Sequence, residues 1–154
     1  MPECLQEKHA PNSVCFGCGP KNSLGLHLKS FAHGDSVEAD WTPRPSHVAF
    51  GDFASGGIIS VLMDCHGDWA ATYSLMKSKE LTRAPGTVTA EYTVRFLKPT
   101  PIDKEWHLRA WPTKVDGRRV NVSAELTCDE IVTATMSGLF IEVKEGHPAY
   151  NRWH

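Results

Sequence analysis

The sequence predicts an α+β protein in which an antiparallel β-sheet wraps around one long central helix. Three observations carry this prediction: a very apolar helical run behind two glycines, a regularly alternating strand after it, and further strand segments separated by turn signals. An antiparallel sheet with one apolar face needs a cover, and a helix that is apolar on most sides provides one. The 154 residues, with ordinary apolar and charged fractions, fit one globular domain.

The central helix is predicted over residues 58–76, which are too apolar all round for a surface helix. Its polar side chains recur every fourth residue and form one narrow stripe, made of Ser60, Asp64, Asp68 and Thr72. A carboxylate in a buried helix is costly unless it is paired or used, so Asp64 is the first candidate functional residue. The alternative is that the stripe is a solvent-exposed edge and Asp64 a solubilising charge.

Strands are predicted on both sides of this helix. Residues 26–32 and 36–41 flank His33-Gly34-Asp35, which is typical of a hairpin, and the proline-bearing segment 42–54 then leads to the helix. After the helix, residues 88–96 alternate strictly between apolar and polar, the pattern of a half-buried strand.

Four strands after the helix are predicted to form an antiparallel meander. Pro99 and Pro101 end the first of them, and Asp116-Gly117 is a strong hairpin signal between the next two. The remaining strand segments are 106–115, 120–128 and 131–143. Residues 1–25 are expected to be an irregular N-terminal lead-in, 26–145 the folded domain and 146–154 a C-terminal tail.

Charge and composition narrow the class of partner. The formal net charge is −2 and the basic residues are scattered, which argues against nucleic acid and anionic membrane surfaces and favours a small-molecule substrate. No apolar run approaches the length that a bilayer requires, and no leader-like segment follows the first residue. A cytoplasmic location is therefore expected. Five cysteines, an odd number at irregular spacing, indicate thiols or ligands rather than a disulfide framework.

Cys15-x-x-Cys18 is the one motif with metal-ligand character. With Cys4 and His9 upstream it has the residue types of a structural zinc site, but the spacing matches no common finger. No metal and no cofactor are therefore expected. A thioredoxin-like role is disfavoured as well, because no βαβ unit surrounds the pair.

Cys65-His66 suggests a nucleophile and its base, but the pair is set aside on geometric grounds. Neighbouring side chains on a helix point about 100° apart and cannot share a hydrogen bond.

Four blocks of sequence occur in a specific order and spacing. They are Cys15-Phe16-Gly17-Cys18-Gly19-Pro20-Lys21-Asn22 with Gly25-Leu26, then Thr42-Pro43-Arg44-Pro45-Ser46-His47, then Gly56-Gly57 with Leu62-Met63-Asp64, and finally Arg95-Phe96-Leu97-Lys98-Pro99. Together they resemble the hotdog-fold acyl-CoA thioesterases, in particular those similar to the phenylacetic-acid-pathway (PaaI-like) thioesterases. The resemblance implies a hotdog fold, thioester hydrolysis and an active site shared between two subunits. The family usually has histidine before the two glycines, where this chain has Ser55, and Asp64 stands at the expected distance.

The chemistry of thioester hydrolysis gives Asp64, Gly56 and Gly57 their expected roles. The carbonyl oxygen needs a donor as it gains negative charge, and glycine at a helix N-terminus offers unpaired N–H groups to a close substrate. In the family the position of Gly56 usually has this role, and Asp64 is the expected base or nucleophile. Eight helical steps of about 1.5 Å separate Gly56 from Asp64 by roughly 12 Å, so one carbonyl cannot touch both. We therefore expect a homodimer that joins the two from different chains, with pairing of dimers into tetramers left open.

The remaining candidate residues concern substrate binding. Ser55, His47 and Thr89 are expected to position substrate or water, although His47 also fits a solvated loop histidine and Thr89 an ordinary strand threonine. The expected contacts to coenzyme A phosphates are Lys98, Arg118 and Arg119, which also fit solvated turn charges.

Two functions from different classes follow from these residues. The first is an acyl-CoA thioesterase, a thioester hydrolase that converts an acyl or aryl-acyl thioester to free acid and coenzyme A. The alternative is a non-catalytic hotdog protein that binds an acyl-CoA or related ligand, motivated by Ser55 in place of histidine. A hydratase is disfavoured because such hotdog enzymes typically carry histidine five residues after the aspartate, where this chain has Trp69.

Overall fold

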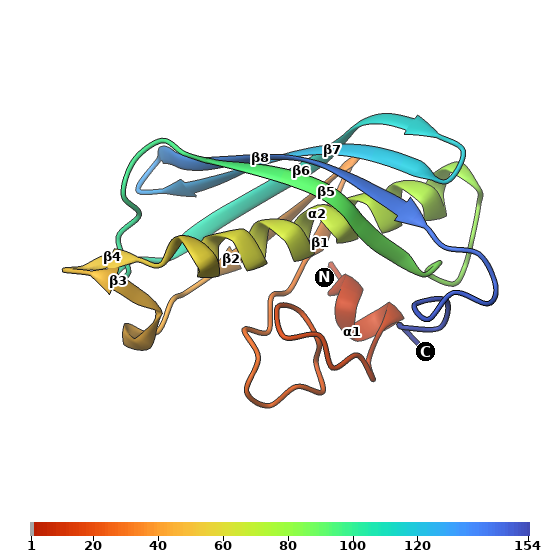
Figure 1. The fold of residues 1–154 in the computed structure, drawn as a ribbon, viewed down its shortest axis with the longest axis horizontal. Coiled ribbons are helices and arrows are strands. Elements are labelled where there is room, and N and C mark those ends of the chain that lie inside the picture. The colour runs from red at the N-terminus through yellow and green to blue at the C-terminus, as the bar shows by residue number, and fades with distance from the viewer. Residues whose placement is uncertain (1) are drawn as a thin grey trace.

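The computed structural model describes residues 2–154 as a curved antiparallel sheet over one long helix (Figure 1). The helix, α2 (Gly56–Ser78), lies along the concave face of a six-stranded sheet. The strand order is β1-β2-β6-β7-β8-β5, with bounds β1 (Phe31–His33), β2 (Ser36–Trp41), β5 (Thr87–Phe96), β6 (Trp106–Asp116), β7 (Arg119–Cys128) and β8 (Ile131–Glu142). The predicted fold class is confirmed.

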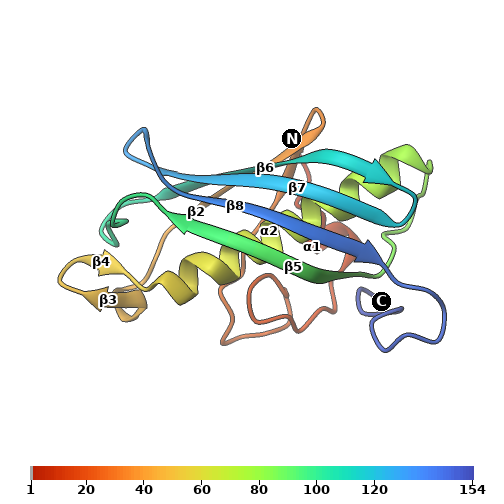
Figure 2. The ribbon, with the colours of Figure 1, turned by 45° about the horizontal axis from the view of Figure 1, so that its top comes forward.

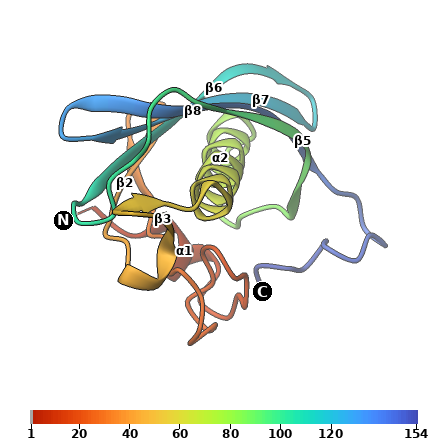
Figure 3. The same ribbon diagram turned by 60° about the vertical axis from the view of Figure 1, so that its left-hand side comes forward.

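A second layer covers the side of α2 that faces away from the sheet. Figure 3 shows the helix nearly end-on, with the sheet above it and the N-terminal segment, including α1 (Leu5–His9), beneath it. The largest buried side chains link these layers; they include Trp69 of α2, Trp106 of β6, Phe140 of β8 and Trp153 of the C-terminal tail. The sheet and both terminal segments thus bury an almost wholly apolar helix.

Local signals set both ends of α2. Ser55 is the N-cap, and its Oγ accepts a hydrogen bond from the Gly57 N–H at 3.2 Å. At the other end Glu80 adopts a left-handed conformation with φ 52°, and the Leu81 N–H bonds the Met76 carbonyl at 2.8 Å. The helix therefore extends two residues beyond the predicted range 58–76 at each end.

The first predicted strand, residues 26–32, is wrong over most of its length. β1 contains three residues only, because His27 has a positive φ of 53° and interrupts extended pairing. The backbone before it is bonded to the N-terminal segment instead, through Leu26 N–H to Phe16 O and Leu28 N–H to Gly17 O. Leu26 and Leu28 thereby pack into the core without belonging to the sheet.

The predicted four-stranded meander is also corrected. β6, β7 and β8 follow one another as hairpins, but β5 pairs with β8 rather than with β6 (Figure 2). The connection after β5 contains Pro99 and Pro101, which cannot support a tight hairpin, so the chain crosses the end of the sheet before β6 begins. This leaves one side of β5 as a sheet edge.

A β-bulge interrupts the strict alternation predicted for residues 88–96. The register between β5 and β8 shifts between Thr89 and Glu91, which leaves Ala90 as the extra residue. Thr89 on one side of the bulge and Phe96 on the other both reach α2, contacting Asp64 and Gly56 respectively. The bulge thus lets the Thr89 hydroxyl and the Phe96 ring, seven residues apart on β5, both face α2.

Short elements occupy segments that are predicted from the sequence to be irregular or connecting. α1 lies within residues 1–25, and the segment before α2 contains a 3-10 turn over Pro45–His47 and a small hairpin of β3 (Val48–Phe50) and β4 (Phe53–Ala54). Within residues 2–154, none of the helices is long and apolar enough to cross a membrane.

His66 is a fully buried histidine in the first half of α2. Its Nδ1 accepts from the Ser30 hydroxyl at 2.8 Å and its Nε2 donates to the Val37 carbonyl at 3.0 Å. Gln6 donates to the same Ser30 hydroxyl, so the network ties the N-terminal segment to the helix. Burial lowers the pKa of His66 to about 4, which keeps the imidazole neutral in the folded protein.

Because His66 stays neutral in the folded protein, we expect the protein to lose stability in acid. Between about pH 6.5 and 4 the unfolded chain protonates this side chain and the folded chain does not. The free energy of unfolding therefore decreases as the pH is lowered through this range, by about 3 kcal/mol in total. His66→Gln should remove this dependence, as measured by urea unfolding across that range. The raised pKa of Asp68 acts in the opposite direction in both proteins and cancels in the comparison. Identical pH slopes would contradict the assignment.

Candidate active site

The N-terminus of α2 leaves the backbone N–H of Gly56 free of its cap. The Gly57 N–H is taken by the Ser55 hydroxyl, whereas the N–H of Gly56, the first helical residue, has no acceptor within the helix. A helix N-terminus carries a partial positive charge, which stabilises an oxygen that gains negative charge. Of the two glycines expected as carbonyl donors, Gly56 is thus the one whose donor is not engaged by the cap.

A largely apolar cavity of about 370 Å³ opens beside Gly56. A Cβ on Gly56 would lie 3.2 Å from the Phe96 ring, so the glycine leaves the backbone accessible where this wall comes close. The other side chains that line the cavity include Phe50, Phe53, Ile59, Leu97 and Lys98. The arrangement fits an apolar group whose reactive end meets a backbone donor.

Asp64 lies two turns further along α2 and is held by β5. Its Oδ1 accepts a hydrogen bond from the Thr89 hydroxyl at 2.6 Å. Burial raises the pKa of Asp64, and the Thr89 hydrogen bond partly opposes that rise. The pKa of the nearby Tyr92 phenol is raised as well, first by burial and then by the Asp64 charge. A half-buried carboxylate with a raised pKa and a fixed orientation is suited to accept a proton from water.

Of the rest of the polar stripe, Asp68 and Thr72 are buried and Ser60 is half-buried, so the stripe is not a solvent-exposed edge. Asp68 is 5% exposed, and its Oδ2 lies 3.5 Å from Nη1 of Arg152 in the C-terminal tail. Burial raises the pKa of Asp68 to about 6, and its Oδ1 has no hydrogen-bond partner among the described residues. The Thr72 hydroxyl donates to the backbone carbonyl of Asp68 at 2.8 Å, and it lies 2.8 Å from the Thr87 hydroxyl, with which it forms a hydrogen bond. The sequence offered no signal for this burial because the tail that causes it is remote in the chain.

The family follows from comparison with known proteins. The sequence model of the thioesterase superfamily matches residues 51–135, a span of more than half of the chain that contains Gly56, Asp64 and Thr89. The chain belongs to the thioesterase superfamily. A comparison with curated protein sequences finds no match.

Solved structures agree with this assignment. A thioesterase superfamily protein from Shewanella loihica PV-4 is 31% identical, with 76% of this chain and 91% of that chain covered and a TM-score of 0.64. The PaaI protein from the phenylacetic acid degradation operon of E. coli is 13% identical, with coverage of 77% and 81% and a TM-score of 0.66. Another thioesterase superfamily protein gives a TM-score of 0.71 at 22% identity, over 84% of this chain; the chain spans 61% of that longer protein. The hotdog fold is thereby confirmed, and the PaaI protein shares it.

In this thioesterase-superfamily chain, His47 is engaged in local structure. Its Nδ1 accepts from the Arg44 N–H at 2.9 Å, and its ring stacks on Trp41 with 5.2 Å between centroids. Burial, followed by the Arg44 charge, lowers the pKa of His47. Its carbonyl accepts from the Ser55 N–H at 2.8 Å, so the residue fixes the approach to α2.

The three basic residues expected at the coenzyme A phosphates divide into two places. Lys98 lines the cavity beside Gly56. Arg118 and Arg119 lie at the β6–β7 turn, where Arg118 donates to the Glu142 carbonyl at 2.9 Å. One chain therefore does not bring the two arginines to the cavity that Lys98 lines.

Cys65 and His66 face different parts of the molecule, as expected for helical neighbours. His66 is bonded to Ser30 and Val37, whereas the Cys65 sulfur lies 3.7 Å from the Cys15 sulfur. Cys65, Asp68 and Tyr92 are the residues around Asp64 that sequence reasoning gave no role.

The Thr89 hydrogen bond gives a prediction for pH dependence. Thr89→Val removes a donor that lowers the pKa of Asp64, so that pKa should rise. A base must be deprotonated, so the acidic limb of the kcat/KM profile for thioester hydrolysis should move to higher pH. Thr93→Val, at an exposed position of the same strand, is the control and should leave the limb in place. An unchanged limb in Thr89→Val would show that this hydroxyl does not set the pKa of the base.

Proposed function

We propose that this protein is an acyl-CoA thioesterase, which hydrolyses an acyl or aryl-acyl thioester to the free acid and coenzyme A. Membership of the thioesterase superfamily supports thioester hydrolysis in general. The observation that carries the finer proposal is the pair of complementary groups on α2: a free N–H at Gly56 beside an apolar cavity, and a half-buried carboxylate at Asp64 held by Thr89. These supply an oxyanion donor and a base.

The site is completed by a second copy of the chain. Gly56 and Asp64 stand eight residues apart on one helix, or about 12 Å, which is too far for a single carbonyl group to contact both. A twofold axis beside α2 would place Gly56 of one subunit opposite Asp64 of the other and create two equivalent sites. The cavity at Gly56 would then receive the acyl group while the partner supplies the base.

The surface of the chain supports such pairing. β5 is an edge strand with exposed side chains along much of its length, which is an arrangement that folded proteins usually cover. Three apolar side chains around the cavity at the N-terminal end of α2 are each more than half exposed: Phe50, Phe96 and Leu97. Apolar side chains gathered beside an open sheet edge are typical of an interface.

The chemistry proceeds with these groups alone. Asp64 accepts a proton from a water molecule while the water oxygen attacks the thioester carbonyl carbon. The Gly56 N–H donates to the carbonyl oxygen as that oxygen becomes negative. When the carbonyl re-forms, the carbon–sulfur bond breaks and the thiolate of coenzyme A leaves with the proton that Asp64 had accepted. Direct attack by the carboxylate, followed by hydrolysis of the anhydride, uses the same residues.

Basic residues fit the other end of the substrate. Lys98 is exposed and lines the Gly56 cavity, so it can meet a phosphate of coenzyme A bound there. Arg118 and Arg119, at the opposite end of the subunit, would contribute only if the partner subunit brings them to the same substrate.

The second candidate is a non-catalytic protein that binds an acyl-CoA or related ligand. It is favoured by Ser55, which caps α2 at the position where similar thioesterases usually carry histidine. If the wild-type protein binds acyl-CoA and releases no free thiol, this candidate replaces the first. Acquisition of hydrolysis by Ser55→His would then identify the missing imidazole as the reason.

Asp64→Asn should lower turnover of a panel of acyl-CoA substrates by at least about a hundredfold, because it removes the base and keeps the shape. Free thiol release is the measurement, with folding checked by circular dichroism. Two variants are the controls. Asp68→Asn removes a carboxylate one turn further along the same helix, and Asp116→Asn removes an exposed carboxylate next to the β6–β7 turn. Both should keep activity within about tenfold of wild type. Wild-type rates in Asp64→Asn would exclude it as the base.

Mixing two inactive variants tests the shared site. Gly56→Ala places a Cβ 3.2 Å from Phe96 beside the carbonyl donor and should be inactive, whereas Gly57→Ala meets only the Ser55 hydroxyl at 3.5 Å and is the matched control. A heterodimer of Gly56→Ala with Asp64→Asn contains one intact site, so unfolding and refolding the mixture should restore about a quarter of wild-type activity. Failure to regain activity, with heterodimers present, would place both residues in a single-chain site.

A further inference from the structure

Three cysteine sulfurs converge beneath α2, away from the Gly56 cavity. The Sγ atoms of Cys15, Cys18 and Cys65 all lie within 4.8 Å of one another, and those of Cys15 and Cys65 are 3.7 Å apart. Cys18 and Cys65 are buried and Cys15 is half-buried. Two of these residues belong to the N-terminal segment and the third to the central helix, so folding rather than sequence spacing brings them together.

The spacing of the sulfurs fits a shared cation better than a covalent bond between them. Two sulfurs bound to one tetrahedral zinc at about 2.3 Å lie about 3.8 Å apart, whereas a disulfide brings them to about 2.0 Å. The observed 3.7 Å between Cys15 and Cys65 matches the first value. Three convergent thiols are a soft ligand set, which selects thiophilic metals over hard cations.

The backbone around the cluster is shaped to bring the sulfurs together. A Cβ on Gly17 would lie 2.3 Å from the Cys65 sulfur, so only glycine allows this turn to rest on the helix. The Gly19 N–H bonds the Cys15 carbonyl at 2.8 Å and closes the turn that carries both cysteines. The Leu28 N–H bonds the Gly17 carbonyl at 3.0 Å and holds the turn against the core.

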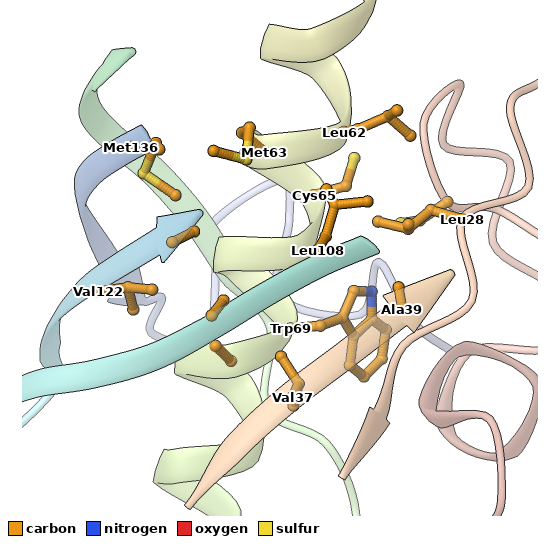
Figure 4. Packing of buried hydrophobic residues seen from close by; sticks show 14 of the residues in the cluster. Leu28, Val37, Ala39, Leu62, Met63, Cys65, Trp69, Leu108, Val122 and Met136 are labelled. Atoms are coloured by element: carbon orange, nitrogen blue, oxygen red, sulfur yellow. The ribbon is translucent and has the colours of Figure 1, made fainter. Parts of the chain in front are cut away.

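Within residues 2–154, Trp69 carries a buried donor without a partner on the side of α2 that holds Cys65. Its side chain is fully buried one turn after Cys65, and Figure 4 shows both projecting from the same side of α2 toward the segment of Leu28. The indole Nε1 has no hydrogen-bond partner among the described residues. A buried N–H without an oxygen acceptor is costly, and a metal-bound thiolate is an acceptor that would satisfy it.

We propose that Cys15, Cys18 and Cys65 bind one Zn²⁺ ion, with a water molecule in the fourth position on the half-buried side of Cys15. The sequence alone favoured no metal because Cys15-x-x-Cys18 lacked further ligands at a recognised spacing. Cys65, 47 residues after Cys18, is the missing third ligand. Cys4 and His9, the upstream candidates, are not part of the cluster.

The ion would be structural and would sit next to the proposed site without taking part in the reaction. It would join the turn of residues 15–19 to α2 at Cys65, the neighbour of Asp64. Zinc would therefore stabilise the N-terminal layer that covers the helix, and its removal should loosen that layer before the sheet.

The test begins with the wild-type protein, reduced and stripped of metal by a chelator. Dialysis against Zn²⁺ should leave one zinc per chain by elemental analysis and raise the thermal midpoint of unfolding. Co²⁺ in place of zinc should give sulfur-to-metal charge-transfer absorption, which reports thiolate ligands directly. This measurement needs no variant and so does not depend on whether variants fold.

Variants then identify the ligands. Cys15→Ser and Cys65→Ser should each lose stoichiometric zinc and the charge-transfer band, whereas Cys128→Ser, a buried cysteine outside the cluster, should keep both. Trp69→Phe should weaken zinc binding by about tenfold or more while preserving the packing. Its control is Trp111→Phe, which changes a tryptophan of β6 outside the fully buried set.

Three results would overturn the proposal. The first is a reduced wild-type protein that takes up no zinc, and the second is a cobalt spectrum without thiolate bands. The third is equal loss of zinc in Cys128→Ser and Cys65→Ser. If the reduced protein takes up no zinc and readily forms a disulfide between Cys15 and Cys18, the cluster is a redox pair instead. None of these results depends on thioester hydrolysis, so this proposal and the proposed function can fail separately.

Discussion

The need to bury α2 determines the rest of the structure. A helix of 23 residues that is apolar on nearly all sides cannot be covered by a sheet on one side only. The sheet therefore curves around it, and the N-terminal segment and the C-terminal tail cover what the sheet leaves open (Figure 3). The titratable side chains buried on this helix then need partners: His66 has Ser30, Asp64 has Thr89, and Asp68 has Arg152.

The same burial divides the two aspartates of the helix by solvent access. Asp68 is nearly enclosed beneath the C-terminal tail and faces the guanidinium of Arg152, whereas Asp64 remains partly accessible and is held by a single hydroxyl from β5. A carboxylate must reach water to act as a base, and it must be partly desolvated to hold a raised pKa. Asp64 satisfies both conditions. The bulge at Ala90 makes this possible, because it lets Thr89 on one side of it and Phe96 on the other both reach the helix.

Sequence reasoning could predict what depends on local periodicity. The helix, the strand after it and the Asp116-Gly117 hairpin all follow from patterns within a dozen residues. The pairing of β5 with β8, the burial of Asp68 and the third cysteine could not be predicted in this way. Each depends on a partner distant in the chain: Arg152 lies 84 residues after Asp68, and Cys65 lies 50 residues after Cys15. The family resemblance supplied the roles of Gly56 and Asp64, which remain proposals, but no role for these long-range contacts.

Ser55 shows how one position can serve either stability or substrate chemistry. Serine is among the best N-cap residues, because its short side chain reaches back to an N–H of the first turn, here that of Gly57. Histidine lacks this advantage, so a histidine at position 55 would leave the Gly57 N–H without its cap and free a polar ring to point elsewhere. With serine, the first turn of α2 is fixed, and the Gly56 N–H is the donor left at the cavity. Serine at this position therefore trades a second polar group near the cavity for a more firmly capped first turn, in which the Gly56 N–H is not engaged by the cap.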